Sequence, residues 1–440
     1  MNKLRYFFEN FKFYYKLIGD YSLYFFKKYF HYIFILSLVA ISFTVRYFFA
    51  LYPTNDVTSF LINWMNAIKE NGFSSFYKIN ADYSSFYLFL LAIFTVLPSG
   101  ELITLVNGVN VYTNWMFYIK FSNFICYLFI SIAFYLIVKK ITKDKIMAVT
   151  AFSLSFILPV QFFNTAIWGN SDAFYICYLI WALYFVISRK DFLSFMFLAF
   201  AFGNKLQAIF FFPLFFYLIL RRRLKLYSVF GFVCGLFITF LPCYCAGGNF
   251  LSPFKYIDSQ LNGYSNLNLG CANFYNFVGL YFGETFNNFF SILGILLILF
   301  FMGFIYFRNI NLNDLSIIAI ATFSSGITVF FLPHMHERYF FILDILIVLY
   351  CLLFKKKYHL IVLMQISSGI AYYHYLSGYY TFQILGENVV TIAALINIYV
   401  LSSIFFDILK LDHKIGFKED LVNLEEKIKN ELSSKDKTIK

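Results

Sequence analysis

The sequence is poor in charged residues, which excludes an ordinary soluble protein. Only 13% of its 440 residues are Asp, Glu, Lys or Arg, whereas 61% are hydrophobic. A soluble chain carries roughly a quarter of charged residues. The apolar residues form runs of about 20, long enough to cross a bilayer core of roughly 30 Å. The sequence therefore predicts an all-α polytopic membrane protein.

Signals of other protein classes are missing as well. The seven cysteines form no CxxC motif and have no regular spacing, which indicates buried thiols rather than a metal or disulfide framework. No Gly-rich dinucleotide fingerprint is present. The net charge of +12 lies in short basic clusters between apolar runs, which is typical of cytoplasmic loops and not of a nucleic-acid-binding surface.

We expect three regions along the chain. Residues 1–30 are basic and aromatic, lack a cleavable small-residue site, and are predicted to form a cytoplasmic interfacial segment rather than a signal peptide. Residues 31–411 form the transmembrane domain, and residues 412–440 form a charged cytoplasmic tail. About twelve spans are predicted, near residues 31–50, 116–138, 146–163, 173–188, 191–203, 206–220, 226–246, 289–307, 314–332, 339–354, 358–376 and 389–409.

The basic clusters decide the topology. They share the cytoplasmic side only if the short apolar stretch 83–100 does not cross the membrane. With that topology, the unusual polar stretches all fall on the non-cytoplasmic face. These stretches are 54–60, 80–87, 166–174, 203–208, 247–288 and 333–340.

Acidic, amide and aromatic side chains in these stretches have two interpretations each. Asp56 either caps the helix that follows it or serves as a general base at the membrane surface. Asp82 either caps the next apolar stretch or binds a sugar. Trp168 fits an aromatic belt at the membrane interface, and Asp172 fits a cap of the helix that follows it. Together, Trp168, Asn170 and Asp172 have a second interpretation. A stacking face beside hydrogen-bonding groups also suits a sugar.

The long loop 256–277 is rich in Asn and Tyr. This composition fits an ordinary external loop, and it also fits a carbohydrate-binding surface, because amides and phenols hydrogen-bond to sugar hydroxyls. Tyr264 and Asn273 are the candidate sugar contacts in this loop.

Several cations on the non-cytoplasmic side are candidates for binding an anion. Lys205, with Gln207 beside it, either snorkels or meets an anion. Arg46 lies within the first span, where a charge costs on the order of 3 kcal/mol and usually faces a cavity or a partner. Arg338 either pairs with Glu337 or grips a phosphate through two parallel hydrogen bonds.

The two histidines of "FLPHMHERYF" (331–340) do not form a familiar zinc motif. His334 and His336 are two residues apart, and this spacing excludes a site of the HExxH type. We predict no metal site, and a need for a divalent cation stays open.

Taken in order, these motifs resemble the GT-C glycosyltransferases that use lipid-phosphate sugars, in particular the GPI-mannosyltransferase-related membrane proteins. Arg46 in the first span precedes Asp56 and Trp64. "DYSSFYLFLL" (82–91) is similar to an Asp-Tyr-Pro-Pro-Leu-Tyr segment of that family. "GNKLQAIFFFP" (203–213) is similar to its Lys-x-Gln turn, and "HMHERYFF" (334–341) to its His-x-His-Glu-Lys/Arg signature.

The resemblance implies a long first external loop that carries membrane-parallel helices. It also implies inverting transfer of one hexose, with mannose favoured, from a polyprenyl-phosphate sugar to a hydroxyl of a glycan or lipid-linked glycan. The expected site is at the non-cytoplasmic face of a bacterial inner or plasma membrane. No nucleotide cofactor is expected, because the donor is a lipid phosphate.

The resemblance also assigns roles to residues. Asp56 is the expected base. The donor would be bound by Arg46, Lys205, Gln207, His334, His336, Glu337 and Arg338. The acceptor or sugar would contact Asp82, Trp168, Asn170, Asp172, Tyr264 and Asn273.

Two other function classes also fit a polytopic membrane protein of this composition. A transporter or flippase of lipid-linked saccharide places its polar residues near mid-membrane, often in related halves. Here the polar residues cluster at one face and no internal repeat is visible. An O-antigen polymerase-like or ligase-like enzyme is also polytopic with a polar external loop, but Asp56 together with the His-x-His-Glu-Arg motif favours the sugar transferase.

Overall fold

The computed structural model of the chain describes residues 28–106, 109–262, 266–278, 286–308, 310–377, 383–384 and 387–411. The chain divides into two compact units, one ending at Phe48 and the other beginning at Phe49. In its described part, the first unit is one apolar helix, Lys28–Phe48. Most of the segment 1–30 and all of the tail 412–440 lie outside the described residues, so their predicted roles stay predictions.

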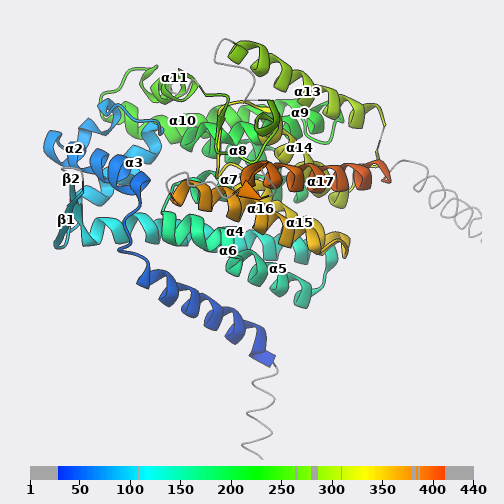
Figure 1. Cartoon of the computed structure of the whole chain (residues 1–440), viewed down its shortest axis with the longest axis horizontal. Coiled ribbons are helices and arrows are strands. Elements are labelled where there is room, and N and C mark those ends of the chain that lie inside the picture. Colours follow the sequence, from blue (N-terminus) through cyan, green and yellow to red (C-terminus); the bar gives the residue numbers. More distant parts are fainter. Residues whose placement is uncertain are drawn as a thin grey trace, which may run out of the picture. The chain divides into compact units, whose positions relative to one another are not determined.

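The second unit is built almost entirely of helices (Figure 1), as its apolar runs predict. Its longer helices are α4 (Thr113–Thr142), α5 (Lys145–Ile157), α7 (Asp172–Ile187), α8 (Asp191–Asn204), α9 (Phe212–Leu220), α10 (Phe230–Cys245), α13 (Asn287–Phe307), α14 (Asp314–Phe331), α15 (Phe341–Phe354), α16 (His359–Leu376) and α17 (Val389–Leu409).

The prediction of an all-α polytopic membrane protein is confirmed. Each predicted span overlaps a helix of the structure. Within the described ranges, six helices are long and apolar enough to cross a membrane, or up to seven if one bent pair is a single span. The number of about twelve crossings stays a prediction, because several of the helices have only 10–17 residues.

The bent pair has a clear chemical cause. Pro159 opens the short helix α6 (Pro159–Phe162) directly after α5, and the two segments meet at an angle of 53°. Proline lacks the amide hydrogen that a continuing helix needs, and it pushes the preceding residue into an extended conformation. The chain then makes a π-helical turn over Phe163–Trp168 and ends it at Gly169, whose φ of 76° is left-handed.

The segment between the first two predicted spans, which is predicted to be an external loop, packs into an apolar cluster with the start of α4 at one end of the second unit. It contains a π-helical turn, Val57–Ile62, then α2 (Asn63–Asn71), a 3-10 helix, Phe73–Lys78, and α3 (Ser85–Val96). It closes with an antiparallel hairpin of β1 (Leu102–Val106) and β2 (Val109–Tyr112). Figure 1 shows α2, α3 and this hairpin grouped together beside the start of α4.

The short length of α3 agrees with the expectation that 83–100 does not cross the membrane. Its 12 residues extend about 18 Å, less than a bilayer core of roughly 30 Å. The hairpin was not expected, and the orientation of these helices to a membrane stays a prediction.

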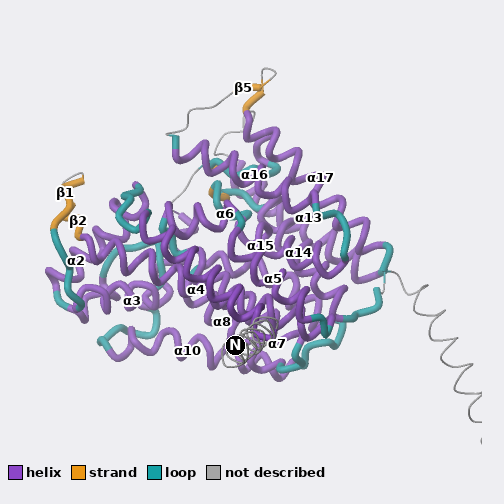
Figure 2. The backbone as a smooth tube through the Cα atoms, turned by 90° about the horizontal axis from the view of Figure 1, so that it is seen from below, coloured by secondary structure: helices purple, strands orange, loops and turns teal. Residues whose placement is uncertain are grey.

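Strands are few and short elsewhere (Figure 2). β3 (Asn268–Leu269) pairs in parallel with β4 (Met335–His336), so the Asn-rich loop is joined to the His-x-His-Glu-Arg motif. β5 (Gln383–Ile384) pairs with β6 (Glu387–Asn388). Two further short helices, α11 (Lys255–Asn262) and α12 (Tyr275–Val278), belong to the same Asn-rich region.

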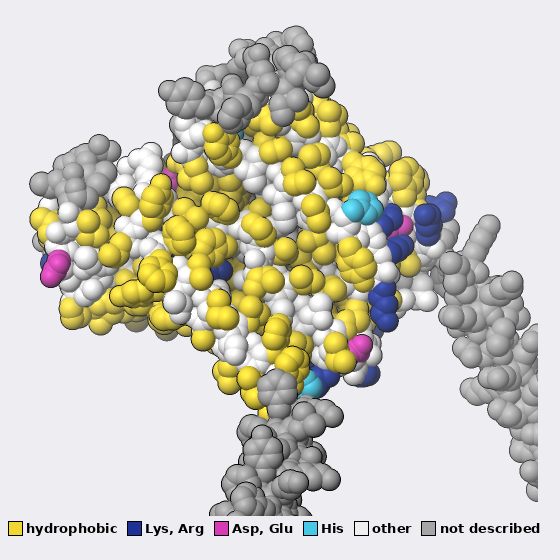
Figure 3. All heavy atoms as spheres, turned by 60° about the horizontal axis from the view of Figure 1, so that its bottom comes forward, with side chains coloured by type: hydrophobic (Ala, Val, Ile, Leu, Met, Phe, Trp, Pro, Cys, Tyr) yellow, Lys and Arg dark blue, Asp and Glu magenta, His cyan; other side chains and the backbone are white. Residues whose placement is uncertain are grey.

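Several helices of the second unit have a polar end and a basic end. α7 begins at Asp172 and is followed by Arg189, while α15 begins just after Arg338 and is followed by Lys355. The 16 residues of α7 separate its two ends by about 24 Å. Figure 3 shows Lys and Arg side chains gathered along one edge of the visible face. The polar motifs therefore lie at the helix ends opposite the basic clusters.

Candidate active site

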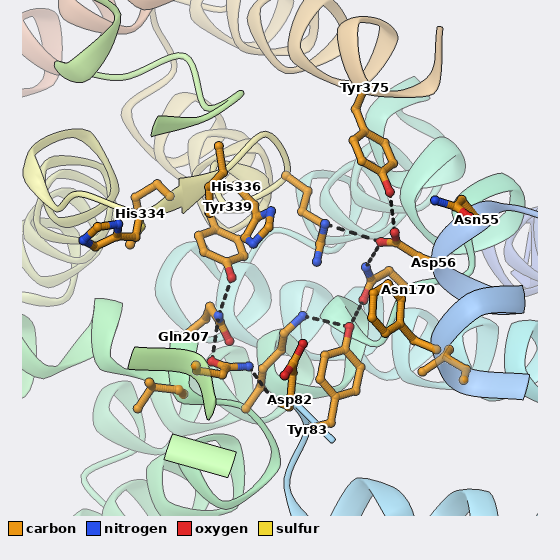
Figure 4. Close-up of a pocket in the computed structure, with 18 of the residues that line it drawn as sticks. Asn55, Asp56, Asp82, Tyr83, Asn170, Gln207, His334, His336, Tyr339 and Tyr375 are labelled. Carbon is orange, nitrogen blue, oxygen red and sulfur yellow. Dashed lines mark hydrogen bonds and ion pairs between the residues drawn. The ribbon is translucent and has the colours of Figure 1, made fainter. Parts of the chain in front are cut away.

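Polar residues from distant parts of the second unit line one cavity of about 850 Å³. Eight of the predicted site residues line it: Asp56, Asp82, Asn170, Lys205, Gln207, His334, His336 and Arg338. Three more, Trp168, Asp172 and Glu337, are buried and bonded to lining side chains. Figure 4 shows Asp56, Asn170 and Tyr375 on one side of the cavity, and His334 and His336 on the other.

The carboxylate of Asp56 is held by donors from three other segments. Its Oδ2 accepts hydrogen bonds from Trp168 Nε1 at 3.0 Å and from Asn170 Nδ2 at 3.1 Å, and Arg338 lies 3.5 Å from the same oxygen. Its Oδ1 accepts a hydrogen bond from the Tyr375 hydroxyl at 2.5 Å. Asp56 does not cap the helical turn that follows it. Its side chain therefore belongs to the cavity, and the capping interpretation is wrong.

Arg338 connects three carboxylates. It lies 2.8 Å from Glu337 Oε1 and 3.5 Å from both Asp56 Oδ2 and Asp172 Oδ2. Burial opposes its positive charge, but the carboxylates of Asp56, Glu337 and Asp172 raise the pKa of Arg338 well above its usual value. Tyr339 lies beside the same guanidinium, with its ring centroid 5.9 Å away. Arg338 is thus a fixed cation within the cavity lining.

Lys205 is a second buried cation with a carboxylate partner. The chain is extended at Lys205, where α8 ends and the 3-10 helix Leu206–Phe211 begins. The ammonium lies 2.5 Å from Asp172 Oδ1 and 4.7 Å from the ring centroid of Tyr83. Asn164 Nδ2 donates to the other oxygen of Asp172 at 3.2 Å. The ion pair is therefore supported by a further hydrogen bond, as buried charges require.

A row of amides and hydroxyls, here called the amide wall, lines another part of the cavity. Gln207 donates to the Tyr339 hydroxyl at 2.6 Å and to Gln260 Oε1 at 3.2 Å. Gln260 donates to the backbone oxygen of Asp82 at 2.6 Å, and Ser259 donates to Asp82 Oδ1 at 2.7 Å. Ser84, not Asp82, caps α3, so Asp82 is available to the cavity.

The two histidines differ in their surroundings. His334 has a left-handed φ of 60°, and its Nδ1 lies 2.8 Å from the backbone oxygen of Asn266. His336 Nδ1 lies 3.7 Å from Glu337 Oε2. In the part of the chain that the structure describes, no three His, Cys, Asp or Glu side chains are grouped to hold a metal ion.

Lys120 of α4 ties together the two chain segments that carry Asp56 and Trp168. Its buried ammonium donates to the backbone oxygens of Phe49 at 2.8 Å, Tyr52 at 2.6 Å and Ile167 at 3.1 Å. These three carbonyl oxygens carry only partial charges. In the described part of the chain, the positive charge of Lys120 is therefore stabilised by three hydrogen bonds and not by an ion pair.

Two further side chains reinforce this connection. Asn123, one turn along α4 from Lys120, donates to the backbone oxygen of Gly169 at 3.2 Å. Thr54 donates to the backbone oxygen of Trp168 at 2.7 Å. Side chains thus donate to the backbone oxygens of three consecutive residues, 167–169. These hydrogen bonds fix the turn that directs Trp168 and Asn170 toward Asp56.

The other three predicted site residues are not among the described residues that line the cavity. Arg46 lies in the first unit, where its Nε donates to Ser42 Oγ at 3.2 Å, and its role stays a prediction. Tyr264 lies outside the described residues. Asn273 is fully buried away from the cavity lining, and its Oδ1 accepts from the backbone nitrogen of Tyr275.

Sequence reasoning missed Tyr375 and the clamping role of Lys120. Tyr375 belongs to "YYHYL" (372–376) at the end of the predicted span 358–376. Nothing in that span marks it as part of a site. Its ring stacks on Trp168 at 4.8 Å and 9°. Tyr83 was also overlooked; its hydroxyl donates to Asn170 Oδ1 at 2.5 Å and orients that amide toward Asp56.

Comparison with protein families gives a match to a sequence profile. The sequence profile of Glycosyltransferase family 87 matches residues 82–333 of the chain, more than half of its 440 residues. The matched segment contains Asp82, Asn170, Lys205 and Gln207 of the cavity lining. No curated protein matches the chain.

We expect Lys120→Met to loosen the Asp56 loop. Three backbone oxygens lose their donor, and each buried acceptor left unpaired costs about 1–3 kcal/mol. The thermal unfolding midpoint in detergent should fall. The matched control is Lys140→Met, because Lys140 lies on the same helix and is exposed. An unchanged midpoint for Lys120→Met would contradict the clamping role.

Proposed function

The chain belongs to glycosyltransferase family 87, and on that premise we propose that this membrane glycosyltransferase moves one hexose, with mannose favoured, from a polyprenyl-phosphate sugar to a hydroxyl of a glycan or lipid-linked glycan. One observation carries the proposal. A carboxylate, Asp56, and a fixed cation, Arg338, come from distant parts of the sequence and face the same cavity 3.5 Å apart.

Asp56 is the proposed general base. The acceptor hydroxyl loses its proton to this carboxylate while its oxygen attacks the anomeric carbon of the donor sugar. The attack comes from the face opposite the phosphate, so the configuration at that carbon inverts. Proton transfer by a positioned base contributes about 10²–10⁴-fold to the rate.

Arg338 and Lys205 are the proposed cations for the donor phosphate. Negative charge grows on the phosphate oxygen as the bond to the sugar breaks, and fixed cations stabilise that charge without reorganising. Their carboxylate partners hold both cations in place before the donor enters. His334 and His336, on the side of the cavity away from Asp56, are the proposed further contacts of the phosphate (Figure 4).

The amide wall is the proposed contact of the sugar ring. The amides of Gln207 and Gln260 can both donate to and accept from hydroxyls, and the carboxylate of Asp82 can accept from them. Tyr339 and Tyr83 add aromatic surface to the same lining, which suits the apolar face of a hexose.

The cavity is proposed to open at the non-cytoplasmic side of the membrane. The helices that end at the cavity carry Lys and Arg clusters at their other ends, and such clusters are retained on the cytoplasmic side. A lipid-phosphate donor would keep its hydrocarbon tail in the bilayer while its headgroup reaches the cavity. The same position at helix ends counts against a transporter, whose substrate site lies near mid-membrane.

A transfer assay tests the donor class. The purified protein in lipid nanodiscs is given radiolabelled synthetic polyprenyl-phosphate mannose, glucose, galactose or arabinose, with a lipid extract of native membranes as the acceptor source. We expect transfer from the mannose donor. Transfer from a nucleotide sugar offered in parallel, with none from any polyprenyl-phosphate sugar, would contradict the proposed donor.

We expect Asp56→Asn to lower kcat by about 10²–10⁴-fold in this assay, because the amide cannot take the proton. The control is Asp144→Asn, since Asp144 caps α5 away from the cavity lining and asparagine caps helices equally well. Equal turnover by wild type and Asp56→Asn would remove Asp56 as the base.

The membrane orientation is tested by cysteine labelling in a variant without the seven native cysteines. Glu101→Cys lies in the first external loop and Lys355→Cys follows α15; both positions are exposed. An impermeant maleimide added to intact cells should label position 101 directly and position 355 only after permeabilisation. The opposite pattern would place the cavity on the cytoplasmic side.

A further inference from the structure

The two oxygens of Asp56 have different surroundings. Trp168 and Asn170 donate to Oδ2, and the guanidinium of Arg338 faces the same oxygen. Among the described residues, the hydrogen bond to Oδ1 comes from the hydroxyl of Tyr375. A carboxylate oxygen has about two lone-pair sites, so Oδ2 is fully used and Oδ1 keeps one site open.

We propose that Oδ1 is the atom that takes the proton, and that Tyr375 is a positioning residue that holds this oxygen toward the acceptor hydroxyl. The inference rests on the proposed function, because it assigns an atom and a partner to the base named there. Asp56 and Tyr375 both line the cavity, so an acceptor hydroxyl in the cavity can approach the site on Oδ1 that the Tyr375 hydroxyl leaves open.

The position of the Tyr375 hydroxyl is fixed by its ring. The ring stacks on Trp168 with centroids 4.8 Å apart and an angle of 9°. Tyr372, one turn earlier on α16, packs edge-on against the same indole at 5.1 Å. Trp168 is fully buried and also donates to Oδ2. One indole therefore orients two of the donors to the carboxylate, its own N–H at Oδ2 and the Tyr375 hydroxyl at Oδ1.

The proposed step balances with these groups alone. The acceptor O–H bond breaks and its proton passes to Oδ1, while the acceptor oxygen forms the new bond to the anomeric carbon. The bond from that carbon to the phosphate oxygen breaks, and its electron pair leaves with the polyprenyl phosphate. Tyr375 keeps its own proton, so its contribution is the orientation of the base.

Tyr375→Phe tests the inference, because it removes the hydroxyl and keeps the ring on Trp168. We expect kcat in the transfer assay to fall about 10- to 100-fold, the size of a lost hydrogen bond to a charged group or a small misplacement of a base. The KM for the donor should stay within about twofold. Rates are normalised to folded protein by size-exclusion chromatography, so that a folding defect does not pass as a lower kcat.

Tyr373→Phe is the matched control. Tyr373 lies on the same helix, its side chain is 49% exposed, and it does not line the cavity. We expect its kcat to match that of the wild type. A wild-type kcat for Tyr375→Phe would overturn the role of Tyr375.

A double variant separates positioning from an unrelated defect. If Tyr375 acts through Asp56, adding Tyr375→Phe to Asp56→Asn should cause no further loss in the residual turnover, followed over hours with a radiolabelled donor. Multiplying losses would mean that Tyr375 acts independently, and would overturn the inference. Wild-type turnover by Asp56→Asn would overturn the proposed base itself, a result that differs from failure of the Tyr375 inference alone.

Discussion

The site depends on one buried guanidinium. Arg338 faces carboxylates from three stretches of the chain, Asp56, Asp172 and Glu337, which would repel one another in the same small volume without it. Buried charges are stable only when they are paired and hydrogen-bonded, so this cation sets the distance between the segment that carries Asp56, the start of α7 and the turn before α15. The ion pair of Lys205 with Asp172 extends the same network to the end of α8.

Much of the helical fold could be predicted, because long apolar runs leave the backbone of a membrane protein few choices other than a helix. The gathering of the polar motifs could also be predicted, since the topology placed them all at helix ends on one side. The β1–β2 hairpin and the 53° bend at Pro159 were not predicted, because both depend on local turns within otherwise ordinary sequence.

Individual contacts were harder to predict than the position of the site. With 36 tyrosines in the chain, nothing in the sequence distinguishes Tyr375 from the rest, although it bonds directly to Asp56. The composition of an Asn-rich loop does not show which of its amides reaches the cavity. The side chain of Asn273 does not line the cavity, and its Oδ1 accepts a hydrogen bond from the backbone nitrogen of Tyr275. The role of Lys120, near the start of the predicted span 116–138, could not be predicted, because its partners are backbone carbonyls, which are the same for every residue type.

The pairing of cations with carboxylates in the cavity determines how strongly a phosphate donor would be bound before and during the proposed reaction. Arg338 and Lys205 already share their charge with Asp56, Asp172 and Glu337, so they would attract a singly charged phosphodiester only weakly. In the proposed reaction, the leaving lipid phosphate would gain a second negative charge when the bond to the sugar breaks, while Asp56 would lose its own charge by taking the proton. Arg338 is thereby released from one carboxylate at the moment when the phosphate needs it most. An interaction that strengthens along the reaction in this way lowers the barrier, whereas equal binding of donor and transition state would not.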